Sequence, residues 1–337
     1  MPTIYDVAKK ARVSVGTVSN VINNKGNVNP KLRKRVEDAM QSINYTPNKA
    51  ARSLASGRSD NIGVLYPFNP NSLTGTSYLE YVSYLITIAQ ESNQQLILYP
   101  ANNSTSAVVD LERIVKSGQV RGFILFEVEM MDHRASYLLS KNIPFSMVGR
   151  TENSEALHCV DADVRQIIND TVLHLKENGY RRMALLGRKS FMGVDYRIHS
   201  ELERACSSHG LEFDPSLRLT SSWHESERAG VIDYFIRRRN DFDVIFITET
   251  AVRFQFVQSI LRRGLRIPED IAVVGYMDSH VDELMQPSIS ATQIPVAPMV
   301  TTAINMLINY EKREPQQVLV PGSFIAREST ERKRSFC

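Results

Sequence analysis

The sequence is poor in the residues that mark secreted, disulfide-bonded or metal-binding proteins. It holds three cysteines in 337 residues, and they are too scattered for a disulfide framework or a zinc site. No stretch approaches the ~18 uninterrupted apolar residues that a membrane-spanning helix needs. The opening MPTIYDVAKK also lacks the apolar run of a signal peptide. We therefore expect a cytoplasmic protein without a membrane partner, a metal or a cofactor.

Catalytic signatures are missing as well. The sequence contains no G-x-G-x-x-G, P-loop, G-x-S-x-G, H-E-x-x-H or C-x-x-C motif. Its seven histidines show no spacing typical of metal ligands. Although α/β folds host much catalysis, we expect a protein that is not an enzyme.

Charge is unevenly distributed along the chain. The composition, 42% hydrophobic and 23% charged, is that of an ordinary globular protein, and the length suits two or three domains. Residues 1–59 contain eleven Lys and Arg against three Asp and Glu, a net charge of +8. Because the whole chain carries only +3, the remainder sums to −5. A basic N-terminal segment on a mildly acidic body predicts a polyanionic partner for that segment alone.

Three short helices are expected in residues 1–47. Thr3 and Asp6 form an acidic capping box that starts the first helix, Ser14 caps the second, and Asn29 caps the third. Apolar residues recur at helical spacing in each: Ile4, Val7, Ala8 and Ala11; Val18, Val21 and Ile22; Leu32, Val36, Ala39, Met40 and Ile43. The third helix should expose Lys31, Arg33, Lys34 and Arg35. Helices of this length, the first two joined by a tight turn, predict a helix-turn-helix unit.

The outward face of the second helix has small and amide side chains and no charge. Its members are Val15, Gly16, Thr17, Ser19, Asn20 and Asn23. A helix that enters the major groove needs small side chains near the base edges and neutral donors and acceptors that match them. Asn20 can pair bidentately with adenine, and Gly16 permits close approach at a helix cost of about 1 kcal/mol. The alternative, a small helical bundle with a polar surface, explains neither the charge nor the glycine.

Residues 48–57, NKAARSLASG, can form a helix of less than three turns. Isolated helices below about 12 residues are marginal in water, so this one should form only when something holds it. Leu54 can wedge between base steps in the minor groove. A linker whose leucine touches the body is an equally good interpretation of this stretch.

Short apolar runs alternate with helical stretches from residue 62 onward. The runs are NIGVLYP, QQLILYP, RGFILFEV, IPFSMVG, RRMALLG, FDVIFITE and IAVVGYMD. Strands separated in this way predict right-handed βαβ units and parallel sheets. Ligands of such sheets bind beyond the carboxyl ends of the strands. The candidate ligand contacts at those ends are Asn69, Arg150, Phe191, Glu249 and Asp278.

Four stretches of the chain carry a family resemblance: TIYDVAKKARVSVGTVSNVIN, NYTPNKAARSLASG, IPEDIAVVGYMD and ARES. In them the chain resembles the LacI/GalR family of bacterial transcription regulators, and the similarity covers essentially its whole length. The resemblance implies an N-terminal all-α helix-turn-helix head and an α/β periplasmic-binding-protein-like core of two doubly wound parallel-sheet subdomains. The boundaries it implies are 1–47 for the head, 48–61 for a hinge helix and linker, 62–160 with 293–320 for the N-terminal core subdomain, 161–292 with 321–332 for the C-terminal one, and 333–337 for a tail.

The resemblance also assigns roles to residues. In this family a recognition helix reads the major groove, and paired hinge helices insert a leucine into the minor groove. The DNA contacts implied here are Thr3, Tyr5, Ser14, Val15, Gly16, Thr17, Ser19, Asn20, Asn23, Lys49, Ala51 and Leu54. Members commonly carry an arginine at the position of Asn20, so the operator half-site should differ from the usual one. In the core, Arg197 matches the family's pocket arginine and Trp223 lies near the position of its stacking aromatic.

Two polar positions common among sugar-binding members are changed. Gly149 stands where an aspartate is frequent, and Met277 stands where an acid precedes Asp278. Hydroxyl selectivity needs matched buried donors and acceptors, so this pocket should discriminate poorly among free sugars. We expect a modified sugar, another small polar metabolite, or no effector at all.

The sequence therefore predicts a dimeric, sequence-specific DNA-binding transcription regulator, a repressor that binds a pseudo-palindromic operator. Its expected partners are double-stranded operator DNA, a second copy of the chain and a small-molecule effector in the core cleft. The alternative is an effector-independent DNA-binding protein whose core is a dimerisation scaffold. The tail ERKRSFC lacks leucine heptads, so we expect no tetramerising coiled coil.

Overall fold

The computed structural model describes residues 2–22, 28–45, 59, 61–66, 75–92, 94–100, 104–190, 192–221, 225–310 and 314–332. The chain divides into two compact units, Met1–Asp60 and Asn61–Cys337, which we call the head and the core. The hinge stretch 48–57 and the tail 333–337 lie outside the described residues.

The described residues of the head form three helices: α1 (Ile4–Ala11), α2 (Val15–Ile22) and α3 (Pro30–Ser42). The capping box predicted for α1 is confirmed, since the backbone N of Thr3 donates to Asp6 Oδ2 at 2.8 Å and the N of Asp6 donates to Thr3 Oγ1 at 3.4 Å. The hydroxyl of Thr3 and then its backbone N–H, which both donate to the Asp6 carboxylate, lower the pKa of Asp6. Ser14 Oγ accepts from the N of Thr17 at 3.1 Å, so the predicted start of α2 is also confirmed.

The three helices of the head bury one small apolar core. Val7, Val18 and Val36, one from each helix, are completely buried. The turn between α1 and α2 is tight because Arg12 takes a left-handed conformation with φ 53°. Arg35 is exposed, as expected, and its Nη2 also donates to the carbonyl oxygen of Ala11 at 2.5 Å. That bond ties α3 to the end of α1 and steadies the turn that positions α2.

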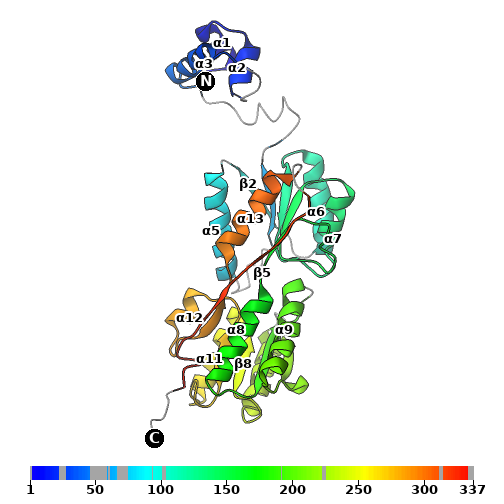
Figure 1. Ribbon diagram of the computed structural model, residues 1–337, viewed down its shortest axis with the longest axis vertical. Helices are drawn as coiled ribbons and strands as arrows, with labels where there is room; N and C mark the ends of the chain where they lie inside the picture. The colour runs from blue at the N-terminus through cyan, green and yellow to red at the C-terminus, as the bar shows by residue number, and fades with distance from the viewer. Residues whose placement is uncertain are drawn as a thin grey trace. The chain divides into compact units, whose positions relative to one another are not determined.

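The first subdomain of the core is built on a parallel sheet. In spatial order its strands are β11 (Gln317–Val320), β5 (Cys159–Ala162), β4 (Phe145–Val148), β3 (Gly122–Leu125), β1 (Ile62–Tyr66) and β2 (Leu96–Pro100). Its helices are α5 (Gly75–Glu91), α6 (Ser104–Ser117), α7 (His133–Ser140) and α13 (Val296–Ile308). α5 packs on α13 on one face of the sheet, and α6 packs on α7 on the other face (Figure 1). Cover on both faces explains why β3 and β4 are buried at every residue.

The second subdomain repeats this plan. Its strands, in spatial order, are β12 (Ser323–Ile325), β10 (Ser290–Gln293), β9 (Ala272–Gly275), β8 (Val244–Ile247), β6 (Met183–Arg188) and β7 (Arg218–Ser221). Its helices are α8 (Val164–Glu177), α9 (Gly193–His209), α10 (Glu225–Arg237), α11 (Thr250–Arg262) and the short α12 (His280–Leu284), with a 3-10 turn at Pro215–Leu217. The sheet is parallel except at its edge, where β12 runs antiparallel to β10. The antiparallel edge strand was not foreseen.

The chain passes between the two sheets three times. It crosses from β5 to α8, from β10 to α13, and from β11 to β12. The prediction of two doubly wound, parallel-sheet subdomains is therefore confirmed. One apolar cluster, which includes Val160, Ile168 and Ile304, continues from one subdomain into the other. Among the described residues no helix is both long and apolar enough to cross a membrane.

Candidate nucleic-acid interface and ligand cavity

The exposed face of α2 is uncharged. Gly16 and Asn20 are exposed, whereas Val15, Thr17 and Ser19 are half-buried. Ser14 is exposed at the start of the helix, where its Oγ lies 2.9 Å from Thr17 Oγ1. The helix thus presents a glycine and an amide on a surface otherwise made of small side chains. Such a surface can approach base edges closely and offer a donor and an acceptor there.

Nothing in the described part of the head requires a glycine at position 16. A Cβ placed on it would meet only Ser14 Oγ, at an ordinary contact distance of 3.7 Å, and its backbone is not in the left-handed region. Alanine would therefore fit and would favour the helix by about 1 kcal/mol. The glycine is best explained by something outside the chain that comes close to α2.

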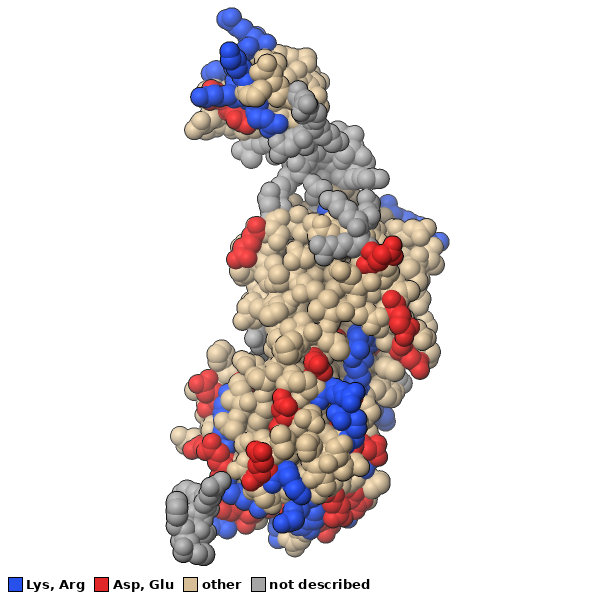
Figure 2. All heavy atoms as spheres, in the orientation of Figure 1, with Lys and Arg blue, Asp and Glu red and all other residues tan. Residues whose placement is uncertain are grey.

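The other two helices of the head, α1 and α3, carry basic side chains. Figure 2 shows Lys and Arg gathered over the head, whereas charges of both signs are interspersed over the core. α1 carries Lys9 and Lys10, and α3 carries Lys31, Arg33 and Lys34. Such a charge distribution attracts phosphates, which fix register without reading sequence.

The remaining predicted DNA contacts are two residues at the start of α1 and four others. The Tyr5 side chain is 71% exposed on α1. Thr3 is committed to the capping box, where its hydroxyl donates to Asp6 Oδ2 at 2.7 Å. Four others, Asn23, Lys49, Ala51 and Leu54, lie outside the described residues.

A cavity of about 150 Å³ lies in the core, where the carboxyl ends of strands from both sheets meet. Segments after β3, β4, β6, β8 and β9 all contribute to its lining. That is the expected place for a ligand in open α/β sheets. Much of the lining is apolar, including Tyr81, Phe126, Val148, Met277, Ile294 and Met299.

Two arginines of the second subdomain reach carboxylates of the first across this cavity. Arg188, at the end of β6, pairs through Nη1 with Glu127 Oε2 at 3.1 Å and through Nη2 with Asp195 Oδ2 at 3.0 Å. Ser190 also hydrogen-bonds Asp195. Burial raises the pKa of Asp195 even though Arg188 opposes that shift.

Arg197 makes the second connection. Its Nη2 lies 2.8 Å from Asp161 Oδ2, and its Nη1 donates to the carbonyl oxygen of Arg150 at 3.2 Å. Arg150 Nε donates to the same Asp161 oxygen at 3.1 Å. Close by, the N of Gly193 donates to the Val128 carbonyl at 2.9 Å. The two halves of the core are therefore joined by polar contacts at the wall of the cavity.

Glu249 contrasts with these paired carboxylates. It precedes α11 at the N-cap position, yet its side chain makes no capping hydrogen bond. The residue is only 6% exposed, and its Oε1 is buried without a hydrogen-bond partner in the described structure. Burial raises the pKa of Glu249, while Arg188 and then Arg228 act in the opposite direction.

Three residues of the lining have left-handed backbones: Glu127 (φ 51°), Gly149 (φ 113°) and Met277 (φ 64°). Non-glycine residues adopt such angles at a cost, and they cluster at functional sites. At Gly149 the angle is unfavourable for any other residue, and an added Cβ would lie 3.3 Å from the Val128 Cβ. The glycine noted in the sequence therefore also suits a backbone angle that other residues rarely adopt.

The structure brings together only some of the residues proposed for ligand binding. Arg197 and Glu249 line the cavity, and Arg150 lies behind Arg197 in the Asp161 network. Asn69, Phe191 and Trp223 lie outside the described residues.

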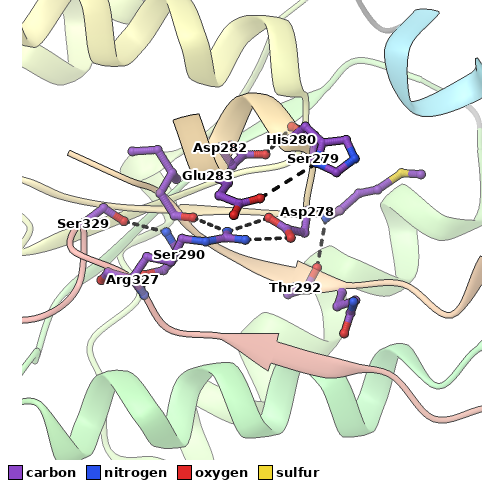
Figure 3. A network of polar contacts seen from close by, with 12 residues as sticks. Asp278, Ser279, His280, Asp282, Glu283, Ser290, Thr292, Arg327 and Ser329 are labelled. Atoms are coloured by element: carbon purple, nitrogen blue, oxygen red, sulfur yellow. Dashed lines mark hydrogen bonds and ion pairs between the residues drawn. The ribbon is translucent and has the colours of Figure 1, made fainter. Parts of the chain in front are cut away.

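Asp278 does not line this cavity. It forms a bidentate ion pair with Arg327, at 2.6 and 2.9 Å, and Figure 3 shows the two side chains facing each other. Arg327 Nη1 also donates to the Ile289 carbonyl at 2.7 Å. Ser329 Oγ donates to the Val273 carbonyl at 2.6 Å and accepts from the N of Ser290 at 2.8 Å. In this network the ARES motif fastens the end of the chain to β9 and β10.

Sequence reasoning missed four charged residues of the lining: Glu127, Asp161, Arg188 and Asp195. Glu127 and Arg188 stand at strand ends, so the rule that found Glu249 could have found them too. Asp161 interrupts the buried strand CVDA, which is a signal because buried charges need partners. Asp195 lies in the first turn of α9, and nothing in its neighbourhood of the sequence marks it.

Two family models match this chain, one over the head and one over part of the core. Residues 3–48 match the family model described as bacterial regulatory proteins, lacI family, and residues 172–330 match the model of a periplasmic binding protein-like domain. Catabolite control protein A of Staphylococcus epidermidis is 26% identical over 332 residues, which cover 98% of this chain and 99% of that protein. The protein of the same name from Priestia megaterium is 23% identical and covers 93% of each chain.

Solved structures show the same architecture over nearly the whole length. The transcriptional regulator CelR in complex with cellobiose aligns with a TM-score of 0.73 and 25% identity, covering 98% of this chain and 100% of that one. The lac repressor dimer bound to operator and an anti-inducer aligns with a TM-score of 0.79, covering 98% and 99%, at 20% identity. At that identity the second likeness concerns the fold alone.

Proposed function

The chain belongs to the LacI family of bacterial regulatory proteins and is a transcription regulator, and from this premise we propose that it represses transcription as a homodimer bound to a pseudo-palindromic operator. The observation that carries the proposal is the neutral face of α2, with exposed Gly16 and Asn20, on a basic head. This surface suits the major groove, while the lysines around it suit phosphates. The protein would act where the chromosome lies, in the cytoplasm.

Dimerisation gives the operator its symmetry. Two heads related by a two-fold axis read two half-sites, and the distance between the heads selects their spacing. Apolar side chains exposed on the core support a contact with a second copy. Tyr84 of α5 and Val281 of α12 line one groove, and Leu284 nearby in sequence is 81% exposed. Exposed apolar groups of this kind are typical of association surfaces.

A small molecule in the cavity controls the distance between the heads. The cavity lies between the two subdomains, so a ligand that contacts both changes the angle between them. That angle sets the separation of the two hinge segments, residues 48–61, and with it the stability of their short helices. Because such a helix is marginal, a coupling of about 1–3 kcal/mol would be enough to gate DNA binding. The ligand we propose is a sugar derivative or another small polar metabolite.

The alternative is a core that serves only as a dimerisation scaffold. Its cavity would need no ligand, and its polar groups would all be satisfied within the chain. Glu249 Oε1 and two nitrogens of Arg197 are buried without hydrogen-bond partners, which favours a cavity that receives a ligand.

Titration of the full-length protein on randomised duplexes, with and without a metabolite panel, tests both interpretations. Enrichment of a two-fold symmetric site is the expected result, and a metabolite that changes the affinity would remove the scaffold alternative. Binding without any preference for sequence would refute the proposal. The hinge has its own test: Leu54→Ala should weaken specific binding more than non-specific binding, since only the specific complex needs the wedge. Equal losses would count against it.

A further inference from the structure

Four carboxylates line the cavity, and the chain itself provides cations for three of them. Glu127 and Asp195 share Arg188, and Asp161 is held by Arg150 and Arg197. Glu249 is the exception, because no ion pair within 4.0 Å reaches it from the residues that the structure describes. Glu249 is therefore a carboxylate of the cavity lining for which the described residues provide no ion pair.

Burial makes this arrangement costly for the empty protein. An ionised carboxylate removed from water without a partner costs several kcal/mol, whereas one that meets a cation with good geometry recovers most of that cost. Glu249 does not relieve its charge by capping α11, since it makes no capping hydrogen bond. Arg188, whose charge opposes the raised pKa of Glu249 more than that of Arg228 does, already pairs with Glu127 and Asp195. Arg228 also acts on Glu249, but no ion pair within 4.0 Å joins the two among the described residues, so we expect the ligand to supply the cation that Glu249 lacks.

Arg197 offers the complementary half of the site. Its Nη2 is ion-paired with Asp161 at 2.8 Å but is not aligned for a hydrogen bond, and its Nε is also buried without a partner. A guanidinium can only donate, so these nitrogens require an oxygen acceptor. Arg197 and Glu249 both line the cavity and come from different elements, α9 and the segment after β8.

We propose that the effector of this cavity is a compact molecule that carries a protonated amine, bound by Glu249, and an oxygen acceptor, bound by Arg197. An amino sugar and an amino acid share this chemistry. The volume of about 150 Å³ is below the ~300–1,000 Å³ usual for drug-sized ligands, so the body that joins the two groups is small. This inference rests on the proposed function, because it names the ligand class of that same cavity.

A neutral sugar hydroxyl would serve Glu249 less well. It would supply one hydrogen bond but would leave the buried negative charge without a cation. Hydrogen bonds to charged groups are worth about 1.5–3 kcal/mol when both partners are well placed. Replacing an ammonium by a hydroxyl at this position should therefore reduce affinity by about tenfold or more.

Matched ligand pairs provide the experiment. Calorimetry on the full-length protein at neutral pH would compare D-glucosamine with D-glucose, D-galactosamine with D-galactose, and L-leucine with the corresponding 2-hydroxy acid. We expect the amine member of at least one pair to bind about tenfold tighter or more. The pair that responds tells an amino sugar from an amino acid. Equal binding within every pair, or no binding of any amine, would overturn the inference.

Glu249→Gln tests the residue itself. The variant should bind both members of the responsive pair alike, and without ligand it should melt about 2 °C or more above the wild type, because no buried charge is left unpaired. Glu155→Gln removes the same charge from an exposed position and should behave as the wild type. An amine preference that persists in Glu249→Gln would assign the contact to another residue and overturn the proposal. Should that variant fail to fold, the ligand pairs on the wild type still decide.

Operator binding by the same preparations separates this inference from the function on which it rests. If the amines fail while the protein still selects a symmetric duplex, only the ligand class is wrong. If the protein selects no duplex, the proposed function fails, whatever the cavity binds.

Discussion

The recognition face of the head and the cavity of the core present polar groups in opposite ways. On α2 the groups that matter are exposed and uncharged, as Gly16 and Asn20 are. In the cavity they are charged, largely buried and mostly bound to one another, as Arg188 is to Glu127 and Asp195. A surface that compares many DNA sequences needs exposed groups whose desolvation costs little free energy. A cavity that responds to one ligand can keep most of its charges in ion pairs and leave one charge unpaired, which that ligand then neutralises.

The two regions should therefore react differently to mutation: changes on α2 should alter recognition at little cost in stability, and changes in the cavity should alter stability first.

The largest expected effect is that of Arg188→Met. Removal of this cation leaves the largely buried carboxylates of Glu127 and Asp195 without their cation, and breaking such pairs costs about 3 kcal/mol or more. Chemical denaturation of the full-length protein would measure the loss. The matched control is Arg266→Met, whose ion pair with Asp270 is exposed and should be worth about 1 kcal/mol or less. Equal losses in the two variants would mean that the ion pairs across the cavity do not hold the subdomains together.

Asn20→Ala should have the next largest effect, and on recognition alone. An amide that pairs bidentately with a base contributes about 1–3 kcal/mol of discrimination, so the variant should lose preference at one position in each half-site. Selection from randomised duplexes would reveal the relaxed position. Thermal unfolding should hardly change, because Asn20 is exposed. An unchanged base preference would remove Asn20 from the readout.

These two regions also differ in how far they could be predicted from the sequence. The caps at Thr3 and Ser14 and the apolar stripe of α1 are local patterns, and the structure contains them where the sequence placed them. The strands were equally accessible, because parallel strands covered on both faces are continuous apolar runs.

The cavity was less accessible because its contacts join residues far apart in the chain. Asp278 stands at a strand end, as Glu249 does, but Arg327 lies 49 residues away in sequence and holds it outside the cavity. Glu127 and Arg188 are separated by 61 residues, and only the packing of two sheets brings them together. The backbone angle at Gly149 left no mark in the sequence beyond the glycine itself.

Gly16→Ala should raise stability and lower affinity together, which would sharpen the contrast between the regions. Alanine fits at this position and favours the helix, so α2 should gain about 1 kcal/mol. Hydrogen exchange on the full-length protein would measure the slower opening of α2. The added methyl group should weaken operator binding, because it lies where the helix meets the base edges. If α2 became more stable while the affinity for operator DNA stayed the same, Gly16 would not approach the duplex.

The smallest effect should be the dependence of core stability on pH. Burial raises the pKa of Glu249 and of Asp195, so the folded protein keeps these protons at pH values where the unfolded chain has released them. Within that window the folded state binds more protons, and stability falls as the pH rises from the ordinary carboxyl range through the raised pKa values. Thermal melts of the wild type and Glu249→Gln across mildly acidic to neutral pH would measure the difference. The melting temperature of the variant should fall less steeply with rising pH, because one of the two buried carboxyl groups has been replaced by an amide. Parallel curves would mean that Glu249 is hydrated in solution, and the cavity would then be as open to water as the face of α2.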